Sequence, residues 1–165
     1  MLPRPLSPAG LAAHPPPLAA RINGWHVITY SEITIDMYDQ LVQGWALLPE
    51  NATGLGDDKQ SIAKYLERNK GCSIAAFNDR KMIGAVLSGH DGRRAFFNHL
   101  FVIPEYRKQG IARKLVDLSF EKLKKEGIKR IGIFIHKSNA SAQLFWNKIG
   151  FEKVDFVETY GIDIK

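Results

Sequence analysis

The segment from Ala95 to Gly127 constrains the fold more than any other part of this sequence. It opens with AFFNHLFVI, the longest β-prone run in the chain, which Pro104 ends because proline has no amide hydrogen for a sheet. After a short loop, apolar or small residues recur at intervals of three and four from Ala112 to Leu123, which predicts an amphipathic helix ending at Gly127. A strand followed by such a helix predicts a sheet with helices packed on it.

The remaining periodicities predict the order β-α-α-β-β-β-α-β-α-β-β. Strands are predicted at residues 25–30, 72–78, 81–89 and 129–136, and helices at residues 33–48, 57–71 and 138–150. Residues 151–164 predict a closing pair of strands. A mixed order with a β-α-β core predicts an α/β fold in which helices cover a sheet, built as one domain from residues 25–165.

Residues 1–24 differ in composition from the rest of the chain. They contain six of the eight prolines, so we predict a disordered extension that builds neither a helix nor a strand ladder. The stretch lacks a lysine-rich start followed by an apolar core, so a secretory signal is not expected.

Composition limits the partners and the compartment. The formal charge of +6 raises nucleic acid or an acidic ligand as a partner, but the densest group of cations, EKLKKEGIKR, is interrupted by glutamates. No surface interleaves aromatic and basic residues, so nucleic-acid binding is the lesser alternative. Cys72 is the only cysteine, which excludes an internal disulfide and a CxxC metal site and fits a reducing, cytoplasmic setting. No apolar run reaches the ~20 residues of a membrane span, and no metal is expected.

The loop RKQGIA lies between the predicted strand and helix and has the chemistry of an anion site. The first turn of a helix leaves backbone N–H groups unpaired, and Gly110 removes the side chain that would keep a phosphate away from them. Arg107, Lys108 and Arg113 add positive charge. A diphosphate is the expected ligand, although a P-loop and a Rossmann fingerprint are both absent.

Two motifs resemble those of the GNAT superfamily of N-acetyltransferases. The run from Arg107 to Ala112 fits its acetyl-CoA signature, [QR]-x-x-G-x-[GA], after a strand. The segment NASAQLFWNKIGFEKV is similar to the downstream motif of the superfamily, with matches at Asn139, Ala142, Phe145, Trp146, Gly150 and Phe151. The resemblance implies a GNAT-type fold, in which a central, mostly antiparallel sheet splays open and is flanked by helices.

The resemblance also implies where acetyl-CoA binds. The pantetheine arm would lie in the splayed gap against the backbone of the strand, and the diphosphate would lie against the amides of the loop. Asn139 and two aromatic residues would reach the arm, although Asn139 is equally a helix cap and Phe145 is equally a core residue. The implied residues are Leu100, Phe101, Val102, Arg107, Lys108, Gln109, Gly110, Ile111, Ala112, Arg113, Asn139, Phe145 and Trp146.

The catalytic groups are less well defined. Family members often place Glu or His at the positions of Phe96 and Asn98, neither of which takes up a proton here, so Asn98 is a candidate for ordering water. His99 is the other candidate, but it points to the opposite face of a regular strand unless a bulge turns it. His90 and Tyr160 are further alternatives for the base.

Trp146 stands where many members use a tyrosine as the acid, which leaves the acid unassigned. The implied reaction is direct attack by a primary amine of a small molecule, an amino acid or a peptide N-terminus on the acetyl thioester. The alternative is a non-catalytic acyl-CoA-binding sensor or partner module. The expected protein is a monomer or a homodimer.

Overall fold

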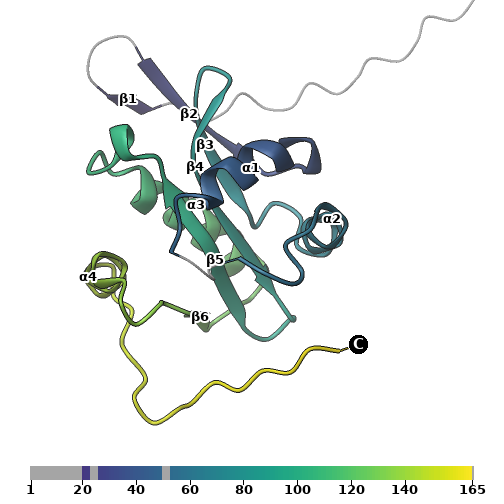
Figure 1. Cartoon of the computed structure of the whole chain (residues 1–165). Helices are drawn as coiled ribbons and strands as arrows, with labels where there is room; N and C mark the ends of the chain where they lie inside the picture. The colour runs from purple at the N-terminus through teal and green to yellow at the C-terminus, as the bar shows by residue number, and fades with distance from the viewer. Residues whose placement is uncertain (1–19, 23–25, 50–52, 165) are drawn as a thin grey trace, which may run out of the picture.

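The structure, a computed structural model, describes residues 20–22, 26–49 and 53–164. Within these residues one sheet has the strand order β1-β2-β3-β4-β5-β6 (Figure 1). Neighbouring strands are antiparallel except β5 and β6, which run parallel. The strands are β1 Ala20–Ile22, β2 His26–Glu32, β3 Ile74–Asn78, β4 Lys81–His90, β5 Ala95–Val102 and β6 Ile131–Ile133.

Helices cover both faces of this sheet. A 3-10 turn, Ile35–Met37, precedes α1, and a second one, Pro104–Tyr106, follows β5. Helices α1 and α2 pack on one face, and α3 and α4 pack on the other (Figure 1). The helices are α1 Tyr38–Trp45, α2 Lys59–Arg68, α3 Ile111–Lys125 and α4 Ala140–Lys148. This arrangement confirms the predicted mixed α/β class. Among the described helices, none is long and apolar enough to cross a membrane.

The central strand β4 shows why helices lie on both sides. Its burial is continuous from Met82 to Gly89, where a strand with one wet face would alternate. Ile83 and Val86 belong to the core cluster under α3 and α4, whereas Met82 and Ala85 belong to the cluster under α1 and α2. The sheet therefore separates two hydrophobic cores.

The predicted N-terminal extension is wrong at its inner end. Residues 20–22 form strand β1, which pairs antiparallel with β2 in the register Ala20↔Ile28. The prolines of the extension end at Pro17, so the following residues are free to donate to a ladder. The rest of the predicted extension, residues 1–19, 23 and 24, lies outside the described residues.

The predicted closing pair of strands at residues 151–164 is also wrong. Phe151 packs on the core beside Phe97 and Trp146, but the chain beyond it forms no strand and is exposed through Ile164. Figure 1 shows this segment, in yellow, running outside β6. The alternation of apolar residues is present, but within the described chain this segment pairs with no other strand.

Candidate active site

The loop before α3 presents free main-chain donors. The helix begins at Ile111, and its N-cap, Gly110, is left-handed with φ 80°. The first hydrogen bond of the helix runs from Lys114 N–H to the Gly110 carbonyl. The amides of Ile111, Ala112 and Arg113 come before it and therefore have no acceptor within the helix. Within the described chain these three amides have no acceptor. A Cβ on Gly110 would meet nothing within 4 Å, so the approach is open.

The side chains of this loop tie it to β5. The Arg107 Nε donates to the Val102 carbonyl at 2.8 Å, and the Gln109 amide donates to the Glu105 carbonyl at 3.2 Å. Arg113 leans along the helix and donates to Asp117 at 2.8 Å. The predicted cations therefore surround the helix start, but Arg107 and Arg113 already hold partners, and Lys108 is exposed.

The C-terminal half of β5 has a free edge beside this loop. Strand β6 pairs with β5 only at residues 95–97, so from Asn98 onwards β5 has β4 as its one strand partner in the described structure. Ile103 N–H donates to the Ile83 carbonyl, so by alternation the backbone of Phe101 faces β4 and the backbones of Leu100 and Val102 face the open edge. Leu100 and Val102 fit the predicted pantetheine contacts. The backbone of Phe101 does not, because it points into the sheet.

A bulge interrupts β5 at His99. Ala85 pairs with Phe101 and Leu87 pairs with Asn98, so β5 uses one residue more than β4 over this interval. His99 has φ 51°, a left-handed conformation that is uncommon for a residue with a side chain. The extra residue reverses the alternation, which sends the side chain of His99 to the α1 and α2 face. The sequence makes His99 a candidate base only if a bulge turns its side chain to this face, and the structure contains that bulge.

His99 is held by two groups on that face. Its Nε2 lies 2.7 Å from Asp57 Oδ1, and its ring centroid lies 4.9 Å from that of Trp45. Both members of the pair are shielded, with side chains 14% and 22% exposed. A carboxylate can only accept, so the Nε2 of neutral His99 carries the hydrogen and Nδ1 keeps a lone pair. In this orientation, the Nδ1 atom of His99 is free to accept a proton.

Asp57 is itself anchored in the segment between α1 and α2. Its Oδ2 accepts from Gly54 N–H at 2.7 Å, and its carbonyl accepts from the Tyr38 hydroxyl at 2.8 Å. Helix α1 lies close to β5 because Gly44 leaves room for the ring of Phe101, which a Cβ would approach to 2.0 Å. The α1–α2 connection therefore places Asp57 against the bulge.

Asn98 lies beside a cavity of about 440 Å³ on the same face of the sheet. Tyr65, His90 and Asp91 also line it, which brings the alternative base His90 near the bulge. Burial raises the pKa of Tyr65 to about 12, and the nearby Asn98 side chain opposes that rise. The phenol is therefore neutral at pH 7, although its hydroxyl lacks a hydrogen bond of good geometry within the described chain.

The other candidate residues have structural roles. Asn139 caps α4, its Oδ1 accepting from the Ala142 N–H at 3.0 Å and from the Ser141 hydroxyl. Trp146 is 6% exposed and packs against Phe97 and Phe145 in the core. Phe145 is partly buried on the same cluster. These packing roles account for Trp146 and Phe145 without a ligand. Tyr160 lies on the exposed C-terminal segment.

The sequence did not single out the partners of His99. Asp57 lies just before α2, where an acid at a helix start is common, and Trp45 lies in α1. The contact between His99 and Asp57 joins residues 42 positions apart, so no local pattern reveals it. In the part of the chain that the structure describes, no group of three His, Cys, Asp or Glu side chains gathers to hold a metal.

Residues 34–151, more than half of the chain, match the acetyltransferase (GNAT) family. The chain belongs to this family. It is 27% identical over 101 residues to an acetyltransferase of Pectobacterium atrosepticum, covering 61% of this chain and 72% of that one. It is also 27% identical over 105 residues to an acetyltransferase of Sodalis glossinidius, covering 64% and 74%. The predicted family and the predicted class of enzyme, an acetyltransferase, are confirmed.

Solved structures show the same fold. An aminoglycoside N-acetyltransferase in complex with CoA superposes with a TM-score of 0.68 at 16% identity, covering 87% of this GNAT chain and 100% of that one. The PaiA N-acetyltransferase from Thermoplasma acidophilum, in complex with coenzyme A, gives 0.67 at 20% identity, covering 79% and 92%. The predicted GNAT-type fold is confirmed, and acetyl-CoA is the donor expected of this family.

Proposed function

We propose that this protein transfers an acetyl group from acetyl-CoA to a primary amine of a small molecule, an amino acid or a peptide N-terminus. One observation carries the proposal: the free edge of β5 ends beside three unpaired amides at the start of α3. Val102 lies at that edge, and Arg107 ties it to the loop. The strand edge suits an extended arm that carries amide groups, and the neighbouring amides of α3 suit a diphosphate.

Acetyl-CoA binds along this edge of β5. Backbone groups of Leu100 and Val102 hydrogen-bond the pantetheine arm as an added strand, and the amides of Ile111, Ala112 and Arg113 bind the diphosphate. Lys108 adds an exposed positive charge. When the arm binds, the Val102 carbonyl accepts a hydrogen bond from it in place of the one from Arg107. The guanidinium of Arg107 is then free to bind a phosphate.

His99 acts as the general base in this proposal. The acceptor ammonium must lose a proton before its nitrogen attacks the thioester carbonyl, and Nδ1 of His99 is free to accept that proton while Asp57 holds Nε2. A new C–N bond then forms as the C–S bond breaks, and the leaving CoA thiolate takes up the second proton that the acylated nitrogen gives up as it becomes an amide. We place the acceptor in the cavity that Asn98 lines with Tyr65 and His90, and Asn98, beside His99, orders water there.

The acceptor in this proposal is a primary amine, the nucleophile that the reaction requires. One similar fold, an aminoglycoside acetyltransferase from a soil metagenome, was solved with sisomicin, but at 17% identity it supports only the fold. Asp91 lines the cavity together with two cations, Arg68 and Arg94, so the charge of the lining does not by itself select a cationic amine.

The runner-up function is a non-catalytic acyl-CoA-binding module. Trp146 favours it, because a buried indole occupies the place where many family members have an acidic tyrosine. Release of CoA thiol from acetyl-CoA, measured with a panel of polyamines, amino acids, peptides and aminoglycosides, separates the two. Turnover with one amine supports the enzyme. Tight CoA binding in native mass spectrometry without any turnover would leave the binding module.

A further inference from the structure

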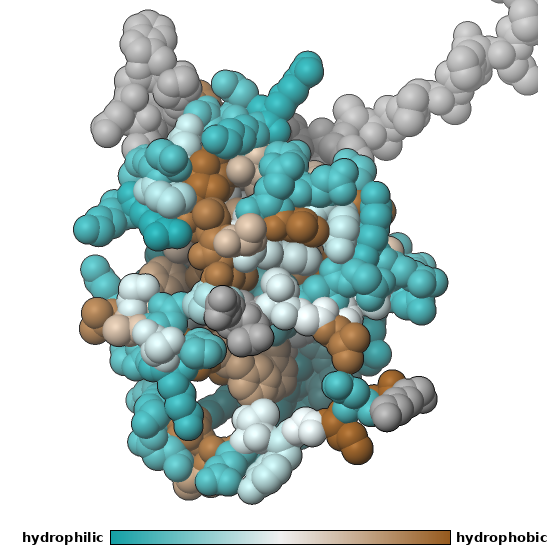
Figure 2. Space-filling view, in the orientation of Figure 1, coloured by the Kyte–Doolittle hydropathy of each residue, from teal (hydrophilic) through white to brown (hydrophobic). Residues whose placement is uncertain are grey.

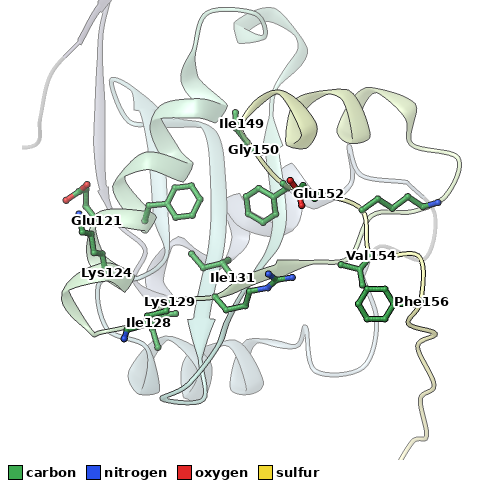
Figure 3. Close-up of a pocket in the computed structure, with 14 residues that line it drawn as sticks. Glu121, Lys124, Ile128, Lys129, Ile131, Ile149, Gly150, Glu152, Val154 and Phe156 are labelled. Atoms are coloured by element: carbon green, nitrogen blue, oxygen red, sulfur yellow. The ribbon is translucent and has the colours of Figure 1, made fainter.

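Two cavities of the described chain lie on opposite faces of the sheet. The one of about 440 Å³ that Asn98 lines, here called the acceptor cavity, lies on the same face as His99. The other, a groove of about 570 Å³, opens between α3, β6 and the residues after α4 (Figure 3). Phe120 and Ile131 of that groove pack on the core under α3 and α4, on the face opposite to His99. A substrate of the proposed base therefore uses the acceptor cavity.

The carboxylate that lines the acceptor cavity, that of Asp91, already has partners. Its Oδ1 accepts from the N–H groups of Arg94 and Arg93, each at 2.8 Å, and its Oδ2 lies 3.8 Å from Nη2 of Arg93. The backbone hydrogen bonds from Arg94 and Arg93 lower the pKa of Asp91, so the group is charged at neutral pH. Its negative charge is therefore largely balanced within its own turn.

The two arginines that line the acceptor cavity have no such partner. Within the described chain, the guanidinium groups of Arg68 and Arg94 form no ion pair. Arg68 is the last residue of α2, and Arg94 directly precedes β5. Both residues are exposed, and both line the same cavity from different elements. The unpaired charge around this cavity is therefore positive.

Asn69 fixes these two elements against each other. It is 4% exposed, its Oδ1 accepts from His90 N–H at 2.8 Å, and its Nδ2 donates to the Tyr65 carbonyl at 3.0 Å. Gly89 leaves room for this contact, because a Cβ there would lie 2.6 Å from the Tyr65 hydroxyl and 2.8 Å from Asn69 Nδ2. The end of α2, which carries Arg68, is thus held beside the end of β4, and the cavity is a fixed part of the fold.

An aromatic side chain gives the acceptor cavity an apolar wall. Phe96 lines the cavity and is 40% exposed, and its ring stacks on that of Phe134 with centroids 5.3 Å apart. Gly132 leaves room for the ring of Phe96, which a Cβ would approach to 2.7 Å. Figure 2 shows that apolar side chains, in brown, reach the surface between hydrophilic ones on the side of the molecule that Figure 1 shows. The cavity therefore combines unpaired positive charge with apolar surface.

We propose that the acceptor is a free amino acid with an apolar side chain, whose carboxylate binds Arg68 and Arg94 and whose side chain packs on Phe96. This inference rests on the proposed function, which supplies the reaction at the amino group. Guanidinium groups bind a carboxylate through charge-assisted, often paired, hydrogen bonds. A polyamine or an aminoglycoside would instead bring more positive charge to two unpaired arginines, and an internal peptide bond offers them no charge. Such acceptors are therefore disfavoured.

The first experiment measures binding without catalysis. Phenylalanine and phenylalaninamide share the ring and the amino group, but only phenylalanine has a carboxylate. In an NMR titration of the full-length protein saturated with CoA, phenylalanine should shift the amide signals of Arg94, Phe96 and Asn98 and bind roughly tenfold more tightly than the amide. The double variant Arg68→Gln, Arg94→Gln should lose this preference. Lys64→Gln is the control, because it removes a cation of α2 that does not line the cavity, and it should keep the preference.

The same titration tests the apolar wall. Glycine, which has a carboxylate but no side chain, should bind more weakly than phenylalanine, and Phe96→Ala should reduce that difference without changing the preference for the carboxylate. Equal binding of phenylalanine and phenylalaninamide, binding of neither, or an unchanged preference in the double arginine variant would overturn the inference. Equal binding of glycine and phenylalanine would overturn the role of Phe96.

The second experiment separates this inference from the proposed function. Release of CoA thiol is expected with phenylalanine, and the double arginine variant should raise KM for phenylalanine about tenfold while kcat changes less than about twofold, because the arginines hold the carboxylate and do not react. If amines without a carboxylate have an equal or higher kcat/KM, the inference is overturned and the proposed function stands. If phenylalanine binds as expected but no amine releases CoA, the carboxylate site stands and the proposed function is overturned.

Discussion

The two halves of the candidate site, the start of α3 and the bulge in β5, are built in different ways. At the start of α3, the donors are main-chain amides of consecutive residues, and Gly110 keeps them accessible. At the bulge, His99 depends on Asp57 and Trp45, which come from α1 and the loop after it. A backbone site tolerates most side-chain changes but not obstruction, whereas a side-chain site fails when one distant partner is lost.

The largest expected effect is at Gly110. The variant Gly110→Glu places a carboxylate among the helix-start amides, so we expect acetyl-CoA affinity, measured by calorimetry, to fall by roughly a thousand-fold, since opposed like charges cost several kcal/mol. Gly127→Glu is the control, because Gly127 has a similar φ of 78° and equally open space at the other end of α3. Equal affinities in the two variants would contradict the backbone site.

The next effect is at His99. We expect His99→Gln to lower kcat about a hundred-fold with the best acceptor of the amine panel, because a general base typically contributes that much or more. Affinity for acetyl-CoA should change less than about twofold, since His99 lies on the opposite face from the α3 loop. His90→Gln is the comparison; if it lowers kcat while His99→Gln does not, the base is His90.

A smaller effect is expected at Asp57. The variant Asp57→Ala removes the acceptor that orients His99, and a charged hydrogen bond of about 1.5 kcal/mol corresponds to about tenfold in kcat. Asp58→Ala, at the next residue, removes the N-cap of α2 and should lower the melting temperature without that loss of kcat. An unchanged kcat in Asp57→Ala would show that the contact with His99 is only structural.

The smallest effect concerns pH and the cap of α2. Hydrogen bonds from the hydroxyl and the N–H of Ser61 lower the pKa of Asp58. The folded state therefore favours the charged form, so the stabilisation is present above the ordinary pKa of Asp58 and is lost as the pH falls through the lowered one. Melting curves of wild type and Asp58→Ala should differ by a few degrees at pH 7 and converge as the pH falls through the lowered pKa of Asp58. A constant difference would contradict this cap.

Most of the fold was predictable because its signals are local. The periodicity from Ala112 to Leu123 gives α3, and Pro104 gives the end of β5, each from a few neighbouring residues. The closing strands were not predictable in the same way. Alternation in residues 154–164 shows that a strand is possible, but a strand forms only where another edge meets it.

The candidate site also has a part that local sequence predicts and a part that it does not. Gly110 and the loop could be found because the helix start needs only consecutive residues. The bulge at His99 was not visible, since it arises from an unequal count of residues between β4 and β5. The burial of Trp146 likewise depends on Phe97, which lies far away in the sequence. Long-range pairing, not local propensity, decides such features.

The central claim is that main-chain donors of β5 and α3 bind acetyl-CoA, and amide hydrogen exchange tests it most directly. Coenzyme A at saturating concentration is expected to slow exchange at Leu100, Val102, Ile111, Ala112 and Arg113, with little change at Phe101, which already faces β4. Binding without protection of these amides, or protection confined to another surface, would contradict the account.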